Sequence, residues 1–134
     1  MQDLADKWEQ AVRLLAHARH ILLATVDETG TPQLTPVEEC TPVGEGRLTV
    51  RAWIEVPPLE ERGGRSRMAL LLWDEDDRGW QLTGHTVGEA DTAVLDGLAQ
   101  IEEQTHFPQV ERDIVMQVEA IEDFRFVHMP LARD

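Results

Sequence analysis

The stretch Leu22-Leu23-Ala24-Thr25-Val26-Asp27-Glu28-Thr29-Gly30-Thr31-Pro32 has the pattern of a β-hairpin that opens on a buried strand. The run over residues 20–26 is too apolar for a strand with one solvent-exposed face, which indicates a strand that is buried on both faces. Residues 27–30 supply the turn, because Gly30 tolerates a positive φ and Asp27 can bond its own backbone. The second strand, over residues 33–40, follows Pro32 and contains Pro36, so we expect it at a sheet edge or at a bulge.

Further elements extend from this hairpin in both directions. Before it, Leu4, Trp8 and Val12 recur at helical spacing and predict a helix over residues 3–19. After it, residues 47–54 alternate between apolar and polar, which predicts a half-buried strand. We also predict strands over 67–73, 80–87 and 113–128, a helix over 91–104 with Asp91 as its N-cap, and a short helical stretch over 59–62. This order is typical of a mainly β fold with helices, a small antiparallel barrel of about six strands, and we expect residues 1–134 to form a single domain.

The composition limits the partners of the chain. Its 134 residues include 26 acidic and 12 basic side chains, which give a formal net charge of -14. Such a surface repels phosphate backbones and anionic lipid, so we expect no nucleic acid and no membrane partner. The N-terminus lacks the pattern of a signal peptide, and the single cysteine, Cys40, excludes an internal disulfide. A cytoplasmic protein is therefore expected, with Cys40 as an inert thiol beside Glu38 and Glu39.

Side chains able to carry metal or acid–base chemistry do not form a recognisable motif in this sequence. His17 and His20 have a spacing that can share a metal, but no cysteine or carboxylate pairs with them obviously, and we predict no metal site. There is no Ser-His-Asp arrangement, no Cys-x-x-Cys pair and no Gly-rich phosphate loop. His85 lies in a predicted strand and either contacts a ligand or faces the surface. No catalytic side chain is predicted.

Four stretches, taken together in this order, resemble a known family. They are the hairpin over residues 23–32, Gly46-Arg47-Leu48-Thr49-Val50-Arg51, Ser66-Arg67-Met68-Ala69-Leu70-Leu71-Leu72, and Gln81-Leu82-Thr83-Gly84-His85-Thr86. In this arrangement the chain is similar to the FMN-binding split-barrel proteins related to pyridoxamine 5'-phosphate oxidase. In the last stretch Thr86 stands where that family has alanine. The resemblance implies a six-stranded antiparallel split β-barrel.

The resemblance also implies a homodimer with FMN bound at the interface between the two copies. The main-chain groups expected to frame the flavin ring lie in two strands: Thr35, Pro36 and Val37, and Val50, Arg51 and Ala52. The side chains expected to contact the cofactor are Arg51, Trp53, Arg65, Ser66, Arg67 and Gln81. Among these, the arginines would hold the phosphate and Gln81 would bond the phosphate or the ring.

One segment departs from the family. Relatives carry basic residues ahead of a short helix, but this chain has Glu55-Val56-Pro57-Pro58. This segment contains no cation to pair with a phosphate, and its two prolines have no backbone N–H to donate to one. The replacements available are Arg51, Arg62, Arg65 and Arg67, the last three in a Gly-containing basic stretch. We therefore predict an FMN-binding protein that is a small oxidoreductase or a flavin carrier, with an unknown small-molecule substrate. The alternatives are a cofactor-free binding module and a split barrel that binds a deazaflavin or heme.

Overall fold

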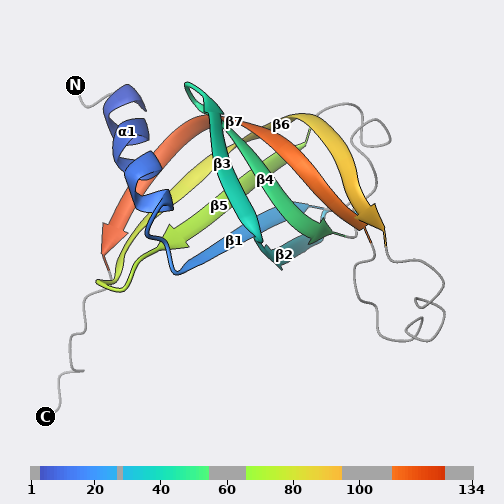
Figure 1. The fold of residues 1–134 in the computed structure, drawn as a ribbon, viewed down its shortest axis with the longest axis horizontal. Coiled ribbons are helices and arrows are strands. Elements are labelled where there is room, and N and C mark those ends of the chain that lie inside the picture. Colours follow the sequence, from blue (N-terminus) through green and yellow to red (C-terminus); the bar gives the residue numbers. More distant parts are fainter. Residues whose placement is uncertain (1–3, 27–28, 55–65, 95–109, 126–134) are drawn as a thin grey trace, which may run out of the picture.

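The structure, a computed structural model, describes residues 4–26, 29–54, 66–94 and 110–125 (Figure 1). These residues form one helix and seven strands. In chain order they are α1 (Leu4–Leu15), β1 (His20–Val26), β2 (Pro32–Pro36), β3 (Glu39–Gly44), β4 (Arg47–Ile54), β5 (Arg67–Trp73), β6 (Arg78–Val94) and β7 (Val110–Arg125).

The strands form one antiparallel sheet in the order β2-β1-β5-β6-β7-β4-β3. Strands β2 and β3 follow each other along the chain but lie at opposite edges of the sheet. The link between them is therefore the place where the sheet closes into a barrel, as Figure 1 shows. At this link the amide of Val37 donates to Ile21 O of β1, at 3.0 Å, while the next amide, Glu38, donates to Arg51 O of β4, at 2.9 Å.

Apolar side chains that alternate along the strands fill the interior of the barrel. Strand β4 is the clearest case, because Leu48, Val50, Ala52 and Ile54 are all buried while the residues between them face outward. Strand β5 follows the same period of two, with Leu70 fully buried. The helix α1 covers one end of this core and packs against β3, β5 and β7, burying Trp8 and Ala11. Among the described residues, no helix is long and apolar enough to span a membrane.

The strands predicted over 20–26, 47–54 and 67–73 are confirmed with the same bounds. The strands predicted over 80–87 and 113–128 are found as β6 and β7 with different ends. The strand count is seven rather than six, because the single strand predicted over 33–40 is two strands. Its two halves bond different neighbours, β1 and β4, on either side of the link at Val37 and Glu38.

Two predicted helices were wrong in their extent. The helix α1 ends at Leu15 rather than residue 19, because tight-turn bonds follow it and Arg19 N already donates to Trp73 O of β5. Asp91 does not cap a helix: β6 continues through it to Val94, paired with β7, and the Asp91 carboxylate accepts a bond from Arg112 Nε at 2.8 Å. Residues 95–104 of that predicted helix, and the helical stretch predicted over 59–62, lie outside the described residues.

Candidate functional site

Arg51 lies on the outer face of β4, between carboxylates of both neighbouring strands. It is opposite Asp113 of β7 and Glu39 of β3. Its Nε and Nη2 donate to Asp113 Oδ1 and Oδ2, at 2.8 and 3.0 Å, which is the two-pronged geometry that suits a guanidinium best. The hydrogen bond and charge of Asp113 raise the pKa of Arg51 above its ordinary value. The hydrogen-bonding capacity of this guanidinium is therefore largely committed to a protein carboxylate.

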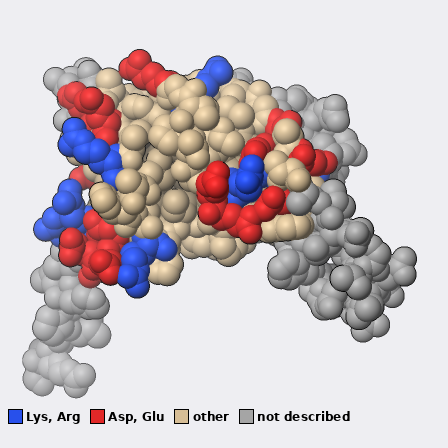
Figure 2. Space-filling view, in the orientation of Figure 1, with Lys and Arg blue, Asp and Glu red and all other residues tan. Residues whose placement is uncertain are grey.

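A pair of glutamates completes an acidic surface around Arg51. The side chain of Glu38, at the closure of the barrel, shares a hydrogen bond with Glu111 of β7, which raises the pKa of Glu38 and lowers that of Glu111. Trp53, also on the outer face of β4, forms a hydrogen bond with Glu38 that partly offsets this rise. Figure 2 shows a basic side chain ringed by acidic ones on this face of the barrel. Such a ring repels a phosphate group.

A second group of polar side chains lies at the start of the β5–β6 hairpin. Arg67 Nη1 is 3.7 Å from Glu119 Oε1, and His85 Nδ1 is 3.3 Å from the same oxygen. The imidazole of His85 is mostly buried, whereas the Arg67 side chain is 76% exposed. The exposure of Arg67 leaves its guanidinium able to turn toward a ligand, in contrast to Arg51.

The structure does not gather the predicted cofactor residues into one compact cluster. Arg51 and Arg67 lie on strands that β6 and β7 separate. Val50 and Ala52 are fully buried in the core, so only their main chains are available to a ligand. Gln81 is exposed and faces outward on β6, but it lies opposite Leu71, four residues along β5 from Arg67.

The remaining predicted residues lie near the barrel closure or at the edge of the described chain. Thr35 and Pro36 belong to the edge strand β2, and the Val37 amide is already used by Ile21 O. Ser66 is partly buried, and its carbonyl accepts a hydrogen bond from Thr86 N at 2.8 Å. Arg65, like the Glu55–Pro58 segment, lies outside the described residues.

The carboxylate partners of the arginines are the residues that sequence reasoning missed. Alternation along residues 110–118 puts Glu111 and Asp113 on one face, and this signal is visible in the sequence. Which strand they face depends on the pairing of β4 with β7, across an interval of 62 residues between Arg51 and Asp113. Alternation alone does not specify that pairing.

The other reactive side chains do not assemble into a site within the described chain. Burial raises the pKa of the Cys40 thiol to about 12, which keeps it protonated and unreactive at neutral pH. His20 packs against Trp73, with 5.1 Å between the ring centroids. Among the described residues there is no group of three or more His, Cys, Asp or Glu side chains placed to hold a metal ion.

Comparisons with known proteins bear on the fold. Neither protein-family models nor curated proteins match the chain. Among solved structures, a protein from Lactobacillus delbrueckii assigned as a pyridoxamine 5'-phosphate oxidase is 22% identical, with a TM-score of 0.54 over 85% of this chain and 91% of that one. A Clostridium acetobutylicum protein of the pyridoxinephosphate oxidase family, related to general stress protein 26, is 12% identical, with a TM-score of 0.55 over 90% and 89%. HupZ of Group A Streptococcus is 13% identical, with a TM-score of 0.53 over 87% and 93%.

These likenesses confirm the predicted fold class. The chain has the split-barrel fold of pyridoxamine 5'-phosphate oxidase-like proteins.

Proposed function

We propose that this chain is a flavin-binding split-barrel protein that forms a homodimer, binds FMN at the interface and serves as a small oxidoreductase or flavin carrier. The observation that carries the proposal is an uncharged surface with one exposed cation at its border. Strands β2, β1 and β5 are neighbours in the sheet, and Arg67 is the only charged residue in them, although 28% of the chain is charged. A surface so depleted of charge is typical of the centre of a protein interface.

The outer face of these three strands supports a dimer. Leu34 is 72% exposed and Val26 is 44% exposed. Leu34 lies opposite Ala24, which in turn lies opposite Ala69, so a row of apolar side chains crosses the three strands. Contiguous apolar surface of this kind favours association, and a second copy of the chain would offer the same surface in return.

The residues beside this surface fit a flavin in part. Arg67 is exposed enough to give a phosphate a charge-assisted contact, and the neighbouring Ser66 could add a hydroxyl donor. Strand β2 is a terminal strand of the described sheet, so its outer edge presents backbone groups for the polar rim of a flavin ring. Arg51 does not fit a phosphate, because Asp113 occupies it. When bound, FMN would supply hydride or electron transfer, while these residues would bind the ring, orient it and shield it from water.

The test is an absorbance spectrum of the protein after incubation with FMN and desalting. We expect a flavin band nearly equimolar with the chain. Arg67→Ala should weaken FMN binding about tenfold or more, because it removes a charged contact to the phosphate. The matched control is Arg47→Ala, since Arg47 is exposed on β4 and bonds Gln117. The proposal is wrong if the wild-type protein retains no flavin.

The dimer has its own test, which does not depend on flavin. Leu34→Glu should convert a dimer to a monomer in analytical ultracentrifugation, because it places a charge at the centre of the apolar row. Val43→Glu is the control, since Val43 is also exposed, at 51%, but lies on β3 at the other edge of the sheet. A wild-type protein that sediments as a monomer at micromolar concentration would contradict the dimer.

A cofactor-free binding module is the second candidate, and the surroundings of Arg51 favour it. Asp113 neutralises this arginine, and Glu38, Glu39 and Glu111 add negative charge around it. A chain that dimerises through the apolar row but retains no flavin would support this second function.

A further inference from the structure

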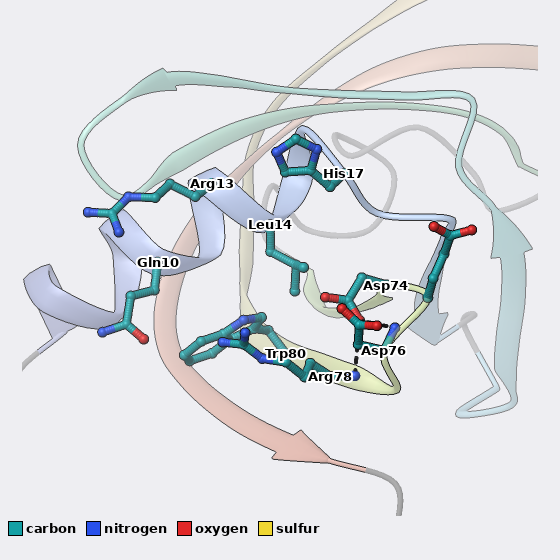
Figure 3. A pocket seen from close by; sticks show the side chains of 9 residues that line it. Gln10, Arg13, Leu14, His17, Asp74, Asp76, Arg78 and Trp80 are labelled. Carbon is teal, nitrogen blue, oxygen red and sulfur yellow. Dashed lines mark hydrogen bonds between the residues drawn. The ribbon is translucent and has the colours of Figure 1, made fainter.

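A hollow of about 420 Å³ lies between α1 and the turn that joins β5 to β6 (Figure 3). A second hollow of about 440 Å³ shares Arg78 and Trp80 with the first. Both are as large as the pockets that bind small molecules, which start at about 300 Å³. They lie at the turn of the β5–β6 hairpin, whereas Arg67 lies at its opposite end, opposite His85. This region is therefore separate from the flavin site proposed above.

An apolar floor lies in the first hollow. Trp80 is 6% exposed and turns one part of its indole to the hollow. Leu14 points from α1 toward Trp80, as Figure 3 shows. The exposed edge of this indole and the partly exposed side chain of Leu14 offer an apolar contact against which an aromatic ring can pack.

The arginines around this floor differ from the other basic residues of the chain. The structure describes nine lysine and arginine residues. Five of them donate a hydrogen bond to a carboxylate, an amide or a main-chain carbonyl, and the sixth, Arg67, forms an ion pair with Glu119; the five are Lys7, Arg19, Arg47, Arg51 and Arg112. The side chains of Arg13, Arg78 and Arg125 form no ion pair or hydrogen bond with other residues in the described part of the chain, and all three line these two hollows.

This clustering is unexpected in a chain with 26 acidic side chains against 12 basic ones. The acidic residues of the β5–β6 turn do not account for it, because two of them have other partners. Asp74 Oδ1 accepts hydrogen bonds from the amides of Asp76 and Arg78, at 2.8 and 3.1 Å, and so shapes the turn. Glu75 pairs with Arg19. Guanidinium groups that form no ion pair with a carboxylate, next to an apolar floor, suit an organic anion.

The carboxylates also limit how much negative charge a ligand can bring. Asp74, Glu75 and Asp76 line the first hollow beside Arg13 and Arg78, so a polyphosphate would meet strong repulsion. A single carboxylate matches the forked geometry of one arginine and avoids that repulsion. We propose that this region binds a small aromatic carboxylate, with its ring against Leu14 and the exposed edge of Trp80 and its carboxylate bound by Arg78.

The experiment uses 2-naphthoate as the probe and 2-naphthylmethanol as its neutral counterpart, each titrated into the ¹⁵N-labelled full chain without flavin. The signal to follow is the indole N–H of Trp80, assigned with a Trp80→Phe variant. The variants are Arg78→Gln and Arg13→Gln. The matched control is Arg47→Gln, because Arg47 is exposed and lies on β4, away from both hollows.

We expect 2-naphthoate to shift the Trp80 signal in a saturable way, and the alcohol to bind about tenfold more weakly or worse. Arg78→Gln should weaken the carboxylate about tenfold and leave the alcohol unchanged, while Arg47→Gln should change neither. The proposal is overturned if the carboxylate does not saturate by about 10 mM, a limit well above ordinary ligand affinities. It is also overturned if the two probes bind equally, or if Arg78→Gln leaves the affinity for 2-naphthoate intact. None of these outcomes depends on FMN binding.

Discussion

Replacing Gly84 with alanine should strongly destabilise the barrel, because β6 and β7 leave no room for a methyl group at this position. Gly84 lies on β6 at a register shift against β7, where the two backbones come unusually close. A Cβ atom at this position would lie 1.9 Å from the carbonyl oxygen of Gln117 and 3.1 Å from Cα of Val118. Both neighbours are backbone atoms, so no side-chain rotation can relieve the overlap.

The magnitude follows from the separation that the methyl group needs. Ordinary contact begins at 3.4 Å, so the two strands must move apart by about 1.5 Å at this point. Such a shift breaks the neighbouring inter-strand hydrogen bonds, each worth about 0.5–1.5 kcal/mol net, and adds packing strain of about 1–3 kcal/mol. We therefore expect the free energy of unfolding to fall by about 3–5 kcal/mol, which is a large share of a typical total of about 5–15 kcal/mol.

The matched control is Gly88→Ala, four residues further along the same strand. There a Cβ atom would come no closer than 4.0 Å to Val115, which is ordinary contact. Alanine restricts the unfolded chain more than glycine does, so this variant should be as stable as the wild type or more stable by about 0.5 kcal/mol.

Guanidinium chloride unfolding, followed by circular dichroism, measures both variants. In a thermal melt followed by the same signal, each kcal/mol corresponds to about 3–4 °C in Tm for a chain of this size, so Gly84→Ala should unfold about 10 °C or more below the wild type. Equal midpoints for the Gly84 and Gly88 variants would refute the close approach of β6 and β7 at Gly84.

Two further predictions concern Cys40 and Gly79. Burial raises the pKa of the Cys40 thiol from 9.0 to about 12, so the unfolded chain loses this proton at a lower pH than the folded chain. The contribution of the protonated thiol to the free energy of unfolding is therefore complete below pH 9 and is lost as pH rises toward 12. Relative to Cys40→Ala, the wild type should lose about 2 kcal/mol of unfolding free energy between pH 8 and pH 10.5, and a difference independent of pH would contradict the burial of the thiol. At Gly79 a Cβ atom would lie 2.3 Å from the Phe124 ring and 2.8 Å from Leu72 O, so Gly79→Ala should cost about 1–3 kcal/mol in the same unfolding assay. Introducing Phe124→Ala into that variant should recover only part of the loss, since the backbone clash with Leu72 persists, and full recovery would show that the ring alone sets the cost.

The local elements were predictable because their signals are local. The alternation over residues 47–54 identified β4 and its buried face, and the apolar runs identified β1 and β5 with their observed bounds. Pro32 and Pro36 correctly indicated an edge strand, since β2 ends the sheet. The two helix predictions that were wrong, at the end of α1 and at Asp91, failed because pairing with distant strands overrides local preference.

The candidate site was less predictable because it depends on which strands become neighbours. Arg51 was expected to hold a phosphate, and the sequence contains nothing beside it that signals a bidentate partner. Only the pairing of β4 with β7 brings Asp113 opposite Arg51. The hollow around Trp80 was missed for the same reason: its arginines come from α1, β6 and β7, and each one read alone in the sequence resembles a solvated surface residue.

The way the barrel closes has a consequence for the solubility of the protein. Because the two ends of the sheet are joined by a short link at Val37 and Glu38 rather than by a full strand pairing, β2 and β3 each keep an outer edge on which another chain could add a strand. Among the described strands, prolines occur in these two alone: Pro32 and Pro36 in β2, and Pro42 in β3. Each proline removes an amide that an incoming strand would need. These three prolines therefore act against aggregation at the two outer edges of the sheet.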